Sequence, residues 1–314
     1  FCSVVSYIQN MTLFSINMEL SLKLLMDQSM QKTVSVVITT HNRPDYLKES
    51  LAAVLNQTVM PSEVYVIDDG SSVSYEEVLA QFPQEQFTYV KVPVASGANA
   101  ARNLGITKST SDIIAFLDDD DIWHTDYLEQ HIAMHEKADA VTSGYRFLET
   151  PDKIHINPIE TITTEVIKKG NKFCGMSGVT CKTSLAKKLM FDEELKNSQD
   201  WDFFVRITLE NAVFKNIPKD IYFYRRGHVS ISTEVANMPL EKVFPRLKAF
   251  KKHKALLGNE AYNDRVANQI LSQIGKKRNK LSWIALSVRE AGVFATAKVV
   301  LGKDRIKRKL LLNK

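Results

Sequence analysis

The chain has 314 residues, of which 44% are hydrophobic and 25% charged, and its formal net charge is +5. This composition excludes a disordered or collagen-like chain, and only three cysteines exclude a small scaffold held by disulfides. The sparse cysteines fit a reducing compartment, so we expect a cytoplasmic protein with one large domain or two smaller ones.

The small net charge is the sum of two unlike parts. Residues 237–314 contain 19 Lys and Arg against 5 Asp and Glu, whereas the first 236 residues contain 22 basic and 31 acidic residues. A basic segment of this kind is typical of a region that contacts a membrane surface or nucleic acid, and equally of a solvated helical face rich in lysine.

The ends of the chain carry less information. The most apolar stretch, 282–301, contains Arg289, Glu290 and Lys298, so we expect no membrane-spanning helix. No positively charged region precedes an apolar stretch at the N-terminus, as it does in a signal peptide. The chain starts at Phe1 and four methionines precede the first strong strand, so residues 1–32 are expected to be an extension that need not be native.

From residue 33 onward, short apolar runs alternate with helical patterns. The runs predict strands at 34–38, 63–67, 87–92 and 112–117, and the helical spacing predicts helices at 44–55, 75–82 and 98–107. This alternation favours right-handed crossovers and a mostly parallel sheet flanked by helices. Further strands are expected at 140–147, 179–182 and 221–224, a helix near Ser198, and only helices from about residue 238.

Three of the first four strands end at polar clusters. These clusters are residues 39–43, the pair Asp68 and Asp69, and four consecutive aspartates at 118–121. Because ligands bind beyond the carboxyl ends of strands in such sheets, we expect the three clusters to converge on one rim.

The four aspartates are the strongest chemical signal in the sequence. Adjacent carboxylates repel one another, and Mg²⁺ resolves this conflict by taking one or two carboxylates together with substrate phosphates. A solvated acidic turn is the alternative, although the run directly follows a buried strand. Asp68 and Asp69 fit either a ligand-binding pair or an Asp-Gly-Ser turn.

Five segments, in their order and spacing, resemble glycosyltransferase family 2. They are the segments VSVVITTHNR at 34–43, QT at 57–58, VIDDGS at 66–71, GANAARN at 97–103 and FLDDDDIW at 116–123. The resemblance covers about residues 33–230. It implies a GT-A fold, with a catalytic domain at 33–236 followed by a basic helical region at 237–314.

The resemblance also implies an activity, which is inverting transfer of a sugar from a nucleotide-sugar with Mg²⁺ or Mn²⁺. Asp69 would accept from the base, Asp120 would hold the metal and Asp118 or Asp119 would reach the ribose. The residues that the resemblance places at the nucleotide are Thr39, His41, Asn42, Arg43, Asp68, Asp69, Arg102, Asp118 and Asp119. His228 is expected near phosphate or metal, and Trp201, Gly175 and Met176 near the donor or acceptor sugar.

The family's catalytic base is an acidic residue before an aromatic residue at a helix start. The segment SQDWDFF at 198–204 fills that place, so Asp200 is the expected base. The segment departs from the family pattern by having Gln199 where a glutamate is usual, which puts a role for that first carboxylate in doubt. Asp202 is the nearest rival, but it lies on the opposite side of the helix, and Asp200 fits a helix N-cap as well.

The resemblance further implies a UDP-sugar donor and a saccharide or lipid-linked acceptor in surface polysaccharide synthesis. Basic residues at 276–278 and 303–309 flank an amphipathic stretch with Trp283, Leu286, Val293 and Phe294, which favours peripheral contact with the anionic inner face of the cell membrane. A sugar-nucleotide nucleotidyltransferase is the first rival, but the Gly-rich basic loop that it needs after the first strand is missing. A nucleic-acid-binding protein is a more remote rival, without interleaved aromatic residues.

Two pairs of side chains are expected to have no catalytic role. His131 and His135 have the spacing of a metal pair, but no third ligand is evident, and we expect them at the surface. Cys174 and Cys181 are expected to be reduced, buried thiols.

Overall fold

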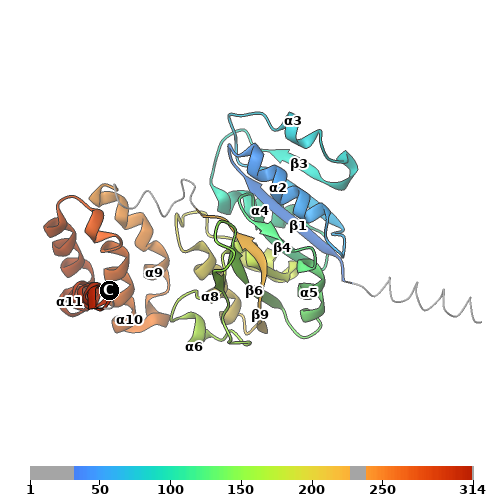
Figure 1. Ribbon diagram of the computed structural model, residues 1–314. Coiled ribbons are helices and arrows are strands. Elements are labelled where there is room, and N and C mark those ends of the chain that lie inside the picture. Colours follow the sequence, from blue (N-terminus) through green and yellow to red (C-terminus); the bar gives the residue numbers. More distant parts are fainter. Residues whose placement is uncertain (1–31, 227–237, 313–314) are drawn as a thin grey trace, which may run out of the picture. The chain divides into compact units, whose positions relative to one another are not determined.

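One mixed sheet of nine strands organises the described part of the chain, which is residues 32–226 and 238–312 of the computed structural model (Figure 1). The strand order is β3-β2-β1-β4-β8-β6-β9-β5, and β7 pairs with β6. The strands are β1 (Val34–Thr40), β2 (Glu63–Asp68), β3 (Thr88–Lys91), β4 (Ile113–Asp118), β5 (Ile122–Trp123), β6 (Ala140–Phe147), β7 (Ile154–His155), β8 (Val179–Lys182) and β9 (Phe214–Tyr224).

The N-terminal half of the sheet has the predicted parallel arrangement. Strand β1 pairs in parallel with both β2 and β4, and β2 pairs in parallel with β3. The other half differs from the prediction, because β8 runs antiparallel to β4 and β6, while β6 and β9 are parallel. Several short elements connect β4 to β8 in place of a single crossover helix, and β8 runs in the opposite direction to β4.

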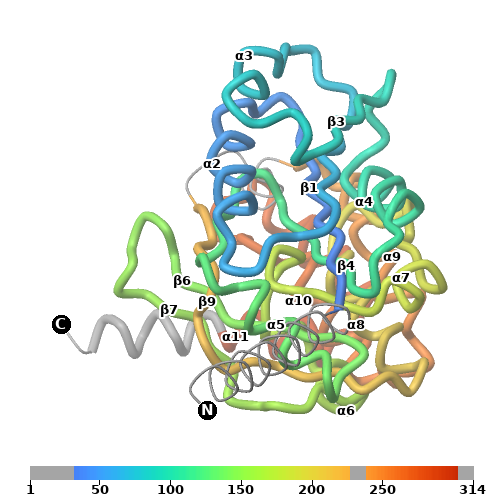
Figure 2. Tube along the Cα trace, turned by 90° about the vertical axis from the view of Figure 1, so that its right-hand side faces the viewer, coloured from blue at the N-terminus to red at the C-terminus, as the bar shows by residue number. Residues whose placement is uncertain are grey.

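Helices cover both faces of the parallel strands. They are α2 (Pro44–Leu55), α3 (Glu76–Leu79), which is shorter than predicted, and α4 (Ala98–Lys108). Helix α2 starts with Pro44 at its first turn and buries Leu47, Leu51 and Val54 on one side. Helices α2 and α4 lie on opposite sides of β1 in Figure 2. Helix α4 packs so closely that a Cβ on Gly105 would meet the Val37 side chain at 2.3 Å.

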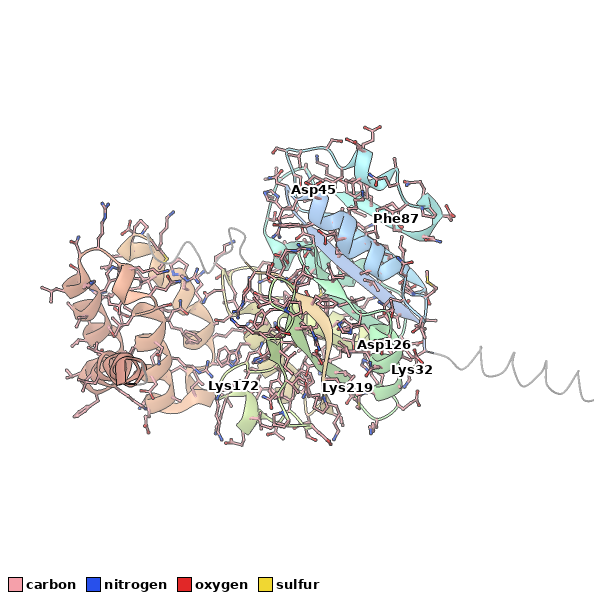
Figure 3. All side chains as sticks on the ribbon, viewed as in Figure 1. Lys32, Asp45, Phe87, Asp126, Lys172 and Lys219 are labelled. Carbon is pink, nitrogen blue, oxygen red and sulfur yellow. The ribbon has the colours of Figure 1, made fainter. Side chains whose placement is uncertain are left out.

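Further elements before residue 226 connect the strands of the mixed half of the sheet and cover it. They are α5 (Tyr127–Met134), α6 (Thr164–Ile167), the short 3₁₀ turn η2 (Met176–Gly178), α7 (Thr183–Leu189) and α8 (Gln199–Leu209). Charged side chains such as Lys172 and Lys219 are exposed at the periphery (Figure 3). Strand β9 is longer than the predicted 221–224, because its first half continues past Pro218.

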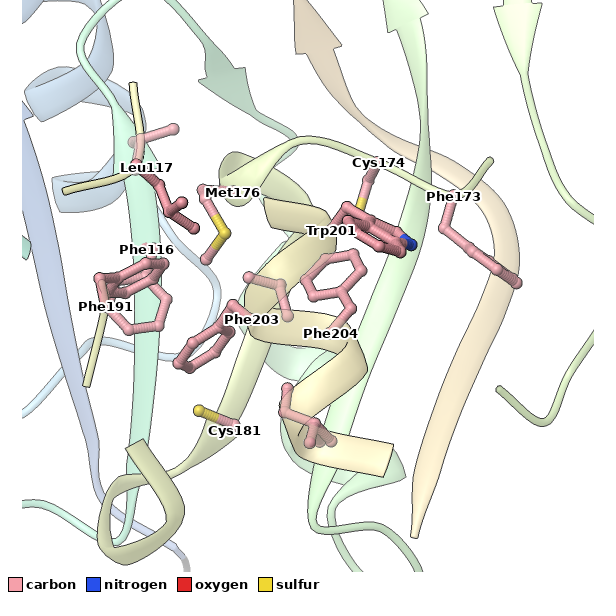
Figure 4. Close-up of a cluster of buried hydrophobic side chains, with 14 of the residues drawn as sticks. Phe116, Leu117, Phe173, Cys174, Met176, Cys181, Phe191, Trp201, Phe203 and Phe204 are labelled. Atoms are coloured by element: carbon pink, nitrogen blue, oxygen red, sulfur yellow. The ribbon is translucent and has the colours of Figure 1, made fainter. Parts of the chain in front are cut away.

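An aromatic cluster fixes α8 against the sheet (Figure 4). The Phe191 ring stacks on Phe203 of α8 with 4.4 Å between centroids, and it meets Phe116 of β4 edge-on at 5.4 Å. All three rings are buried. The start of α8 and the end of β4 are therefore held in a fixed relation, which matters for the carboxylates at both places.

The C-terminal region is helical, as predicted, and comprises η4 (Leu240–Leu247), α9 (Lys248–Lys252), α10 (Lys254–Ile270), η5 (Ile274–Lys276) and α11 (Lys280–Leu312). Trp283 and Leu286 are buried, so they belong to a core and not to an interfacial face. Lys277 is also buried, with its ammonium 3.3 Å from the centre of the Trp283 ring. In contrast, Val293 is 63% and Phe294 93% exposed.

No helix in residues 32–226 or 238–312 combines the length and the apolar character needed to cross a bilayer. The described residues from Val34 onward form one compact unit.

His131 and His135 are not at the surface, which corrects the prediction. Their side chains are 1% and 2% exposed, and a ring nitrogen of each lies 2.9 Å from the Thr180 hydroxyl of β8. Helix α5 turns this side toward the sheet, and burial keeps the pKa of His131 well below its usual value. The prediction for Cys174 and Cys181 is confirmed, since both are free and buried.

Candidate active site

The polar strand ends converge on one cavity of about 750 Å³. It lies beyond the carboxyl ends of β1, β2 and β4, as expected for an open α/β sheet. Its lining includes Thr39, Thr40, His41, Arg43, Asp69, Ala98, Arg102, Asp118, Asp120, Gly175, Met176, Asn197, Ser198, Gln199, Asp200, Tyr224, Arg246 and Gln269.

The four aspartates divide into two pairs by alternation along the chain. Asp118 and Asp120 line the cavity, and their side chains are 31% and 17% exposed. Each is held by an arginine: Arg102 reaches Asp118 at 2.5 Å, and Arg43 reaches Asp120 at 2.8 Å. These two carboxylates are therefore available to a ligand while their positions are fixed.

Asp119 and Asp121 are buried and do not line the cavity. This differs from the predicted place of Asp119 at the nucleotide. The Thr40 hydroxyl donates to Asp119 at 2.6 Å, and Arg43 lies 2.7 Å from its other oxygen. Burial raises the pKa of Asp119 to about 7, although Arg43 and Thr40 oppose the shift. Burial and the neighbouring Asp120 raise the pKa of Asp121 well above its ordinary value.

Asp118 and Asp120 suit a hard divalent cation. Within the described residues, no group of three or more His, Cys, Asp or Glu side chains forms a complete metal cage. Mg²⁺ typically binds one or two carboxylates and completes its shell with phosphate oxygens and water, and Asp118 and Asp120 provide two accessible carboxylates at the edge of the cavity. His228, the other predicted metal contact, lies outside the described residues.

Thr39, His41 and Asp69, which are predicted nucleotide contacts, all line the cavity. The Asp69 carboxylate accepts the N–H groups of Ser96 and Gly97, both at 2.8 Å, and so holds the loop before α4. Gly97 has φ of 101°, a conformation that glycine adopts readily. Each carboxylate oxygen can accept a further hydrogen bond.

Two predicted nucleotide contacts have structural roles instead. Asp68 is fully buried and accepts the Ser71 N–H at 2.8 Å and the Tyr89 hydroxyl at 2.5 Å, so it shapes the turn after β2. The Asn42 side chain accepts the Ser72 N–H at 2.8 Å and fastens the same turn to the end of β1. Neither side chain lines the cavity, because both accept backbone N–H groups of the turn that follows β2.

Asp200 lies in the first turn of α8 and lines the cavity. Its carboxylate accepts a hydrogen bond from the Asn171 amide at 2.6 Å, and the same amide group donates to the Cys174 carbonyl at 2.6 Å. Burial raises the pKa of Asp200, opposed by the Trp201 N–H, Asn171 and the charge of Arg102. A raised pKa makes the carboxylate a better proton acceptor near neutral pH.

Asp202 and Trp201 lie on the buried side of α8. The predicted contact of Trp201 with a sugar in the cavity is therefore wrong, because its side chain does not line the cavity. The Trp201 indole donates to the Ile167 carbonyl at 2.8 Å. Burial alone would raise the pKa of Asp202, but His253, Arg206 and Lys252 lower it to about 2. This network makes Asp202 a structural anion and removes it as a rival base.

Gly175 and Met176 line the cavity, as their predicted place near a sugar requires. Sequence reasoning missed Tyr224, Arg246 and Gln269, which come from β9, η4 and α10. Their positions depend on tertiary packing, and no local motif signals them.

The cavity lies at the carboxyl ends of the parallel strands of an open α/β sheet, and a comparison with known families identifies the family of the chain. The model of the family described as Glycosyl transferase family 2 matches residues 35–194. The chain belongs to this family and is a glycosyltransferase.

Two relatives show similar levels of identity. The chain is 28% identical over 192 residues to the uncharacterized glycosyltransferase YwdF of Bacillus subtilis, which covers 59% of this chain and 71% of YwdF. It is 30% identical over 203 residues to the uncharacterized glycosyltransferase MJ1057 of Methanocaldococcus jannaschii, which covers 61% of this chain and 70% of that protein.

Solved structures share the GT-A fold. S. aureus TarS in complex with UDP-GlcNAc matches 87% of this chain and 92% of its own, with a TM-score of 0.59 and 17% identity. The mannosyltransferase PcManGT from Pyrobaculum calidifontis, in complex with GDP-Man and Mn²⁺, matches 87% of this chain and 80% of its own, with a TM-score of 0.58 and 16% identity. Similarity at this identity concerns the fold alone.

Proposed function

We propose that this glycosyltransferase moves a sugar from a nucleotide-sugar to an acceptor hydroxyl with inversion, and that Asp200 is the base. The observation that supports this most is one cavity that contains Asp69, the pair Asp118 and Asp120, and Asp200. These groups serve the three tasks of the reaction, which are nucleotide recognition, neutralisation of the leaving group and deprotonation of the acceptor.

In the proposed reaction, the acceptor oxygen attacks the anomeric carbon as its proton passes to Asp200. The bond from that carbon to the phosphate oxygen breaks, and a nucleoside diphosphate leaves with the electron pair. Asn171 keeps the Asp200 carboxylate oriented through its 2.6 Å hydrogen bond. Asp118 and Asp120 would hold Mg²⁺ or Mn²⁺, which supplies positive charge to the leaving diphosphate when bound.

The proposed donor is a UDP-sugar. Asp69 would accept an N–H of the base, with Thr39 and His41 beside it, and Arg102 would lie near the phosphates. TarS was solved with UDP-GlcNAc and with UDP, whereas PcManGT was solved with GDP-Man, so the fold accommodates either base.

We expect UDP with Mn²⁺ to raise the Tm of the protein by several degrees, and GDP and dTDP to raise it less, because only a bound ligand shifts unfolding by mass action. Thermal-shift titration with the three nucleotides and their sugars measures this. A larger shift with GDP would contradict the donor assignment. Release of pyrophosphate from sugar phosphate and nucleoside triphosphate would favour the rival nucleotidyltransferase.

The proposed acceptor is a saccharide or a lipid-linked saccharide in surface polysaccharide synthesis, with the C-terminal region on the anionic inner face of the membrane. Val293 and Phe294 support this, because both are exposed where Gly292 interrupts α11. The basic residues of the region provide the matching charge.

Replacing both Val293 and Phe294 with serine should reduce binding to anionic vesicles severalfold, because apolar insertion and charge act together. Vesicle sedimentation with and without phosphatidylserine measures the effect. Leu209→Ser is the matched control, because Leu209 is 52% exposed on the catalytic part. Equal pelleting of all three proteins would contradict membrane contact through this turn.

A further inference from the structure

The C-terminal helical region contributes two side chains to the catalytic cavity. Arg246 of η4 and Gln269 of α10 line the same cavity as Asp200. Both are half-buried. The helical region is therefore part of the site, in addition to any role at a membrane.

Buried charge fixes this region to the helix that carries the base. The Asp202 carboxylate meets the His253 ring at 2.7 Å and the Lys252 ammonium at 3.0 Å, and it is fully buried. Lys252 also reaches Asp192 at 2.7 Å. Removing one partner from such a network leaves an uncompensated buried charge, which is costly. These ion pairs therefore favour one position of the helical region against α8.

A second contact lies beside the first. The Arg265 guanidinium stacks over Trp201 at 4.4 Å and donates to the Lys168 carbonyl at 2.5 Å. Trp201 and Asp202 directly follow Asp200 on α8. The contacts that hold the helical region thus also set Arg246 and Gln269 relative to the base.

The elements that carry Arg246 and Gln269 indicate which side of the cavity these residues belong to. On the proposed nucleotide and metal side, Arg102 and Arg43 pair with Asp118 and Asp120. Arg246 is a third arginine in the cavity lining, and it comes from the helical region that contacts α8, not from the ends of β1, β2 or β4. A guanidinium binds phosphate and carboxylate groups in a bidentate manner, with a fixed orientation.

We infer that Arg246 and Gln269 form an acceptor subsite that recognises an anionic group, phosphate or carboxylate, carried close to the hydroxyl that Asp200 deprotonates. This inference rests on the proposed function. It makes the acceptor an acidic glycan or a phosphate-bearing polyol or lipid head group, and it gives the helical region a role in acceptor choice.

Calorimetric titration of the full chain, saturated with UDP and Mn²⁺, tests the subsite. The probes are glycerol 3-phosphate against glycerol, and glucuronate against glucose, so that the two arms separate phosphate from carboxylate. We expect one anionic probe to bind at least about tenfold more tightly than its neutral partner, as a charged hydrogen bond allows. Arg246→Gln should reduce that preference to about twofold or less.

The matched control is Lys248→Gln, since Lys248 is a cation two residues away that pairs with Glu194 at 2.9 Å outside the cavity. It should keep the preference. Gln269→Ala should weaken the same probe, and it provides a second variant if Arg246→Gln does not fold. The Kd of UDP should stay within about twofold in every variant.

Equal binding of anionic and neutral probes by the unaltered protein would overturn the inference. So would an Arg246→Gln protein that loses UDP affinity and keeps its probe preference, because Arg246 would then serve the donor. A protein that binds no UDP would contradict the proposed function instead, and the anion preference would then be measured without nucleotide.

Discussion

Replacing Asp200 with asparagine should reduce the transfer rate by about a thousandfold, within the range that general-base catalysis contributes. The asparagine keeps the size of the side chain and a hydrogen bond with Asn171, but it cannot take the proton of the acceptor hydroxyl. The Kd of UDP should change by no more than about twofold, because donor groups lie at other strand ends. Rates come from release of nucleoside diphosphate, and Kd values from calorimetry.

Two controls separate catalysis from structure. Glu194→Gln changes an exposed acidic residue that precedes α8 and should leave the rate unchanged. Asp202→Ala should lower the free energy of unfolding by about 3 to 5 kcal/mol, because it leaves Arg206, Lys252 and His253 without their buried anion. Retained turnover in Asp200→Asn, with folding intact, would refute the assignment of the base.

The pH dependence of transfer should carry the signature of the same residue. The base works only when deprotonated, and burial raises the pKa of Asp200. As pH falls, the rate should therefore decline at a higher pH than for a solvated aspartate. Asp202 should affect the pH dependence of stability and not of the rate. Its pKa is lowered to about 2, so its contribution to the free energy of unfolding is kept at neutral pH and is lost only as the pH falls toward 2.

The sequence predicted the strand ends well, because β-branched apolar runs followed by polar residues have few alternatives in an α/β protein. β1, β2 and β4 all start or end within a residue or two of the predicted bounds. This topology alone predicted that Thr39, Asp69 and Asp118 lie together at one edge of the sheet.

Direction of side chains was harder to predict. Alternation sends Asp118 and Asp120 into the cavity and buries Asp119, but four identical residues give no indication of which pair faces outward. Asp68 and Asn42 form a turn and Trp201 packs in the core, although each matches a motif position. Motifs identify backbone positions, whereas hydrogen-bond partners across the turn decide what each side chain does.

Sequence patterns did not predict the packing between segments that are far apart in the chain. The basic charge of the C-terminal region suggested a surface, yet Trp283 and Lys277 are buried together and Arg246 enters the active site. Charge counts record how many basic residues a segment has, and they do not reveal which of them the fold turns inward.

Replacing Asp120 with asparagine should lower the transfer rate by about a hundredfold or more and remove its dependence on Mn²⁺, because a metal held by Asp120 would supply several kcal/mol of charge stabilisation to the leaving diphosphate. Chelation should likewise abolish transfer by the unaltered protein, and added Mn²⁺ or Mg²⁺ should restore it. Metal titrations of the initial rate measure both effects.

Asp220→Asn provides a closely matched control for this prediction. Asp220 is 19% exposed and pairs with Arg146 at 2.7 Å, while Asp120 is 17% exposed and pairs with Arg43 at 2.8 Å. The two sites thus share burial and an arginine partner, but only Asp120 lines the cavity. Loss of an ion pair alone would affect both variants alike. An unchanged metal titration in Asp120→Asn would show that this carboxylate does not hold the ion. A loss of rate confined to Asp120→Asn would indicate that Asp120 holds the metal that neutralises the leaving diphosphate.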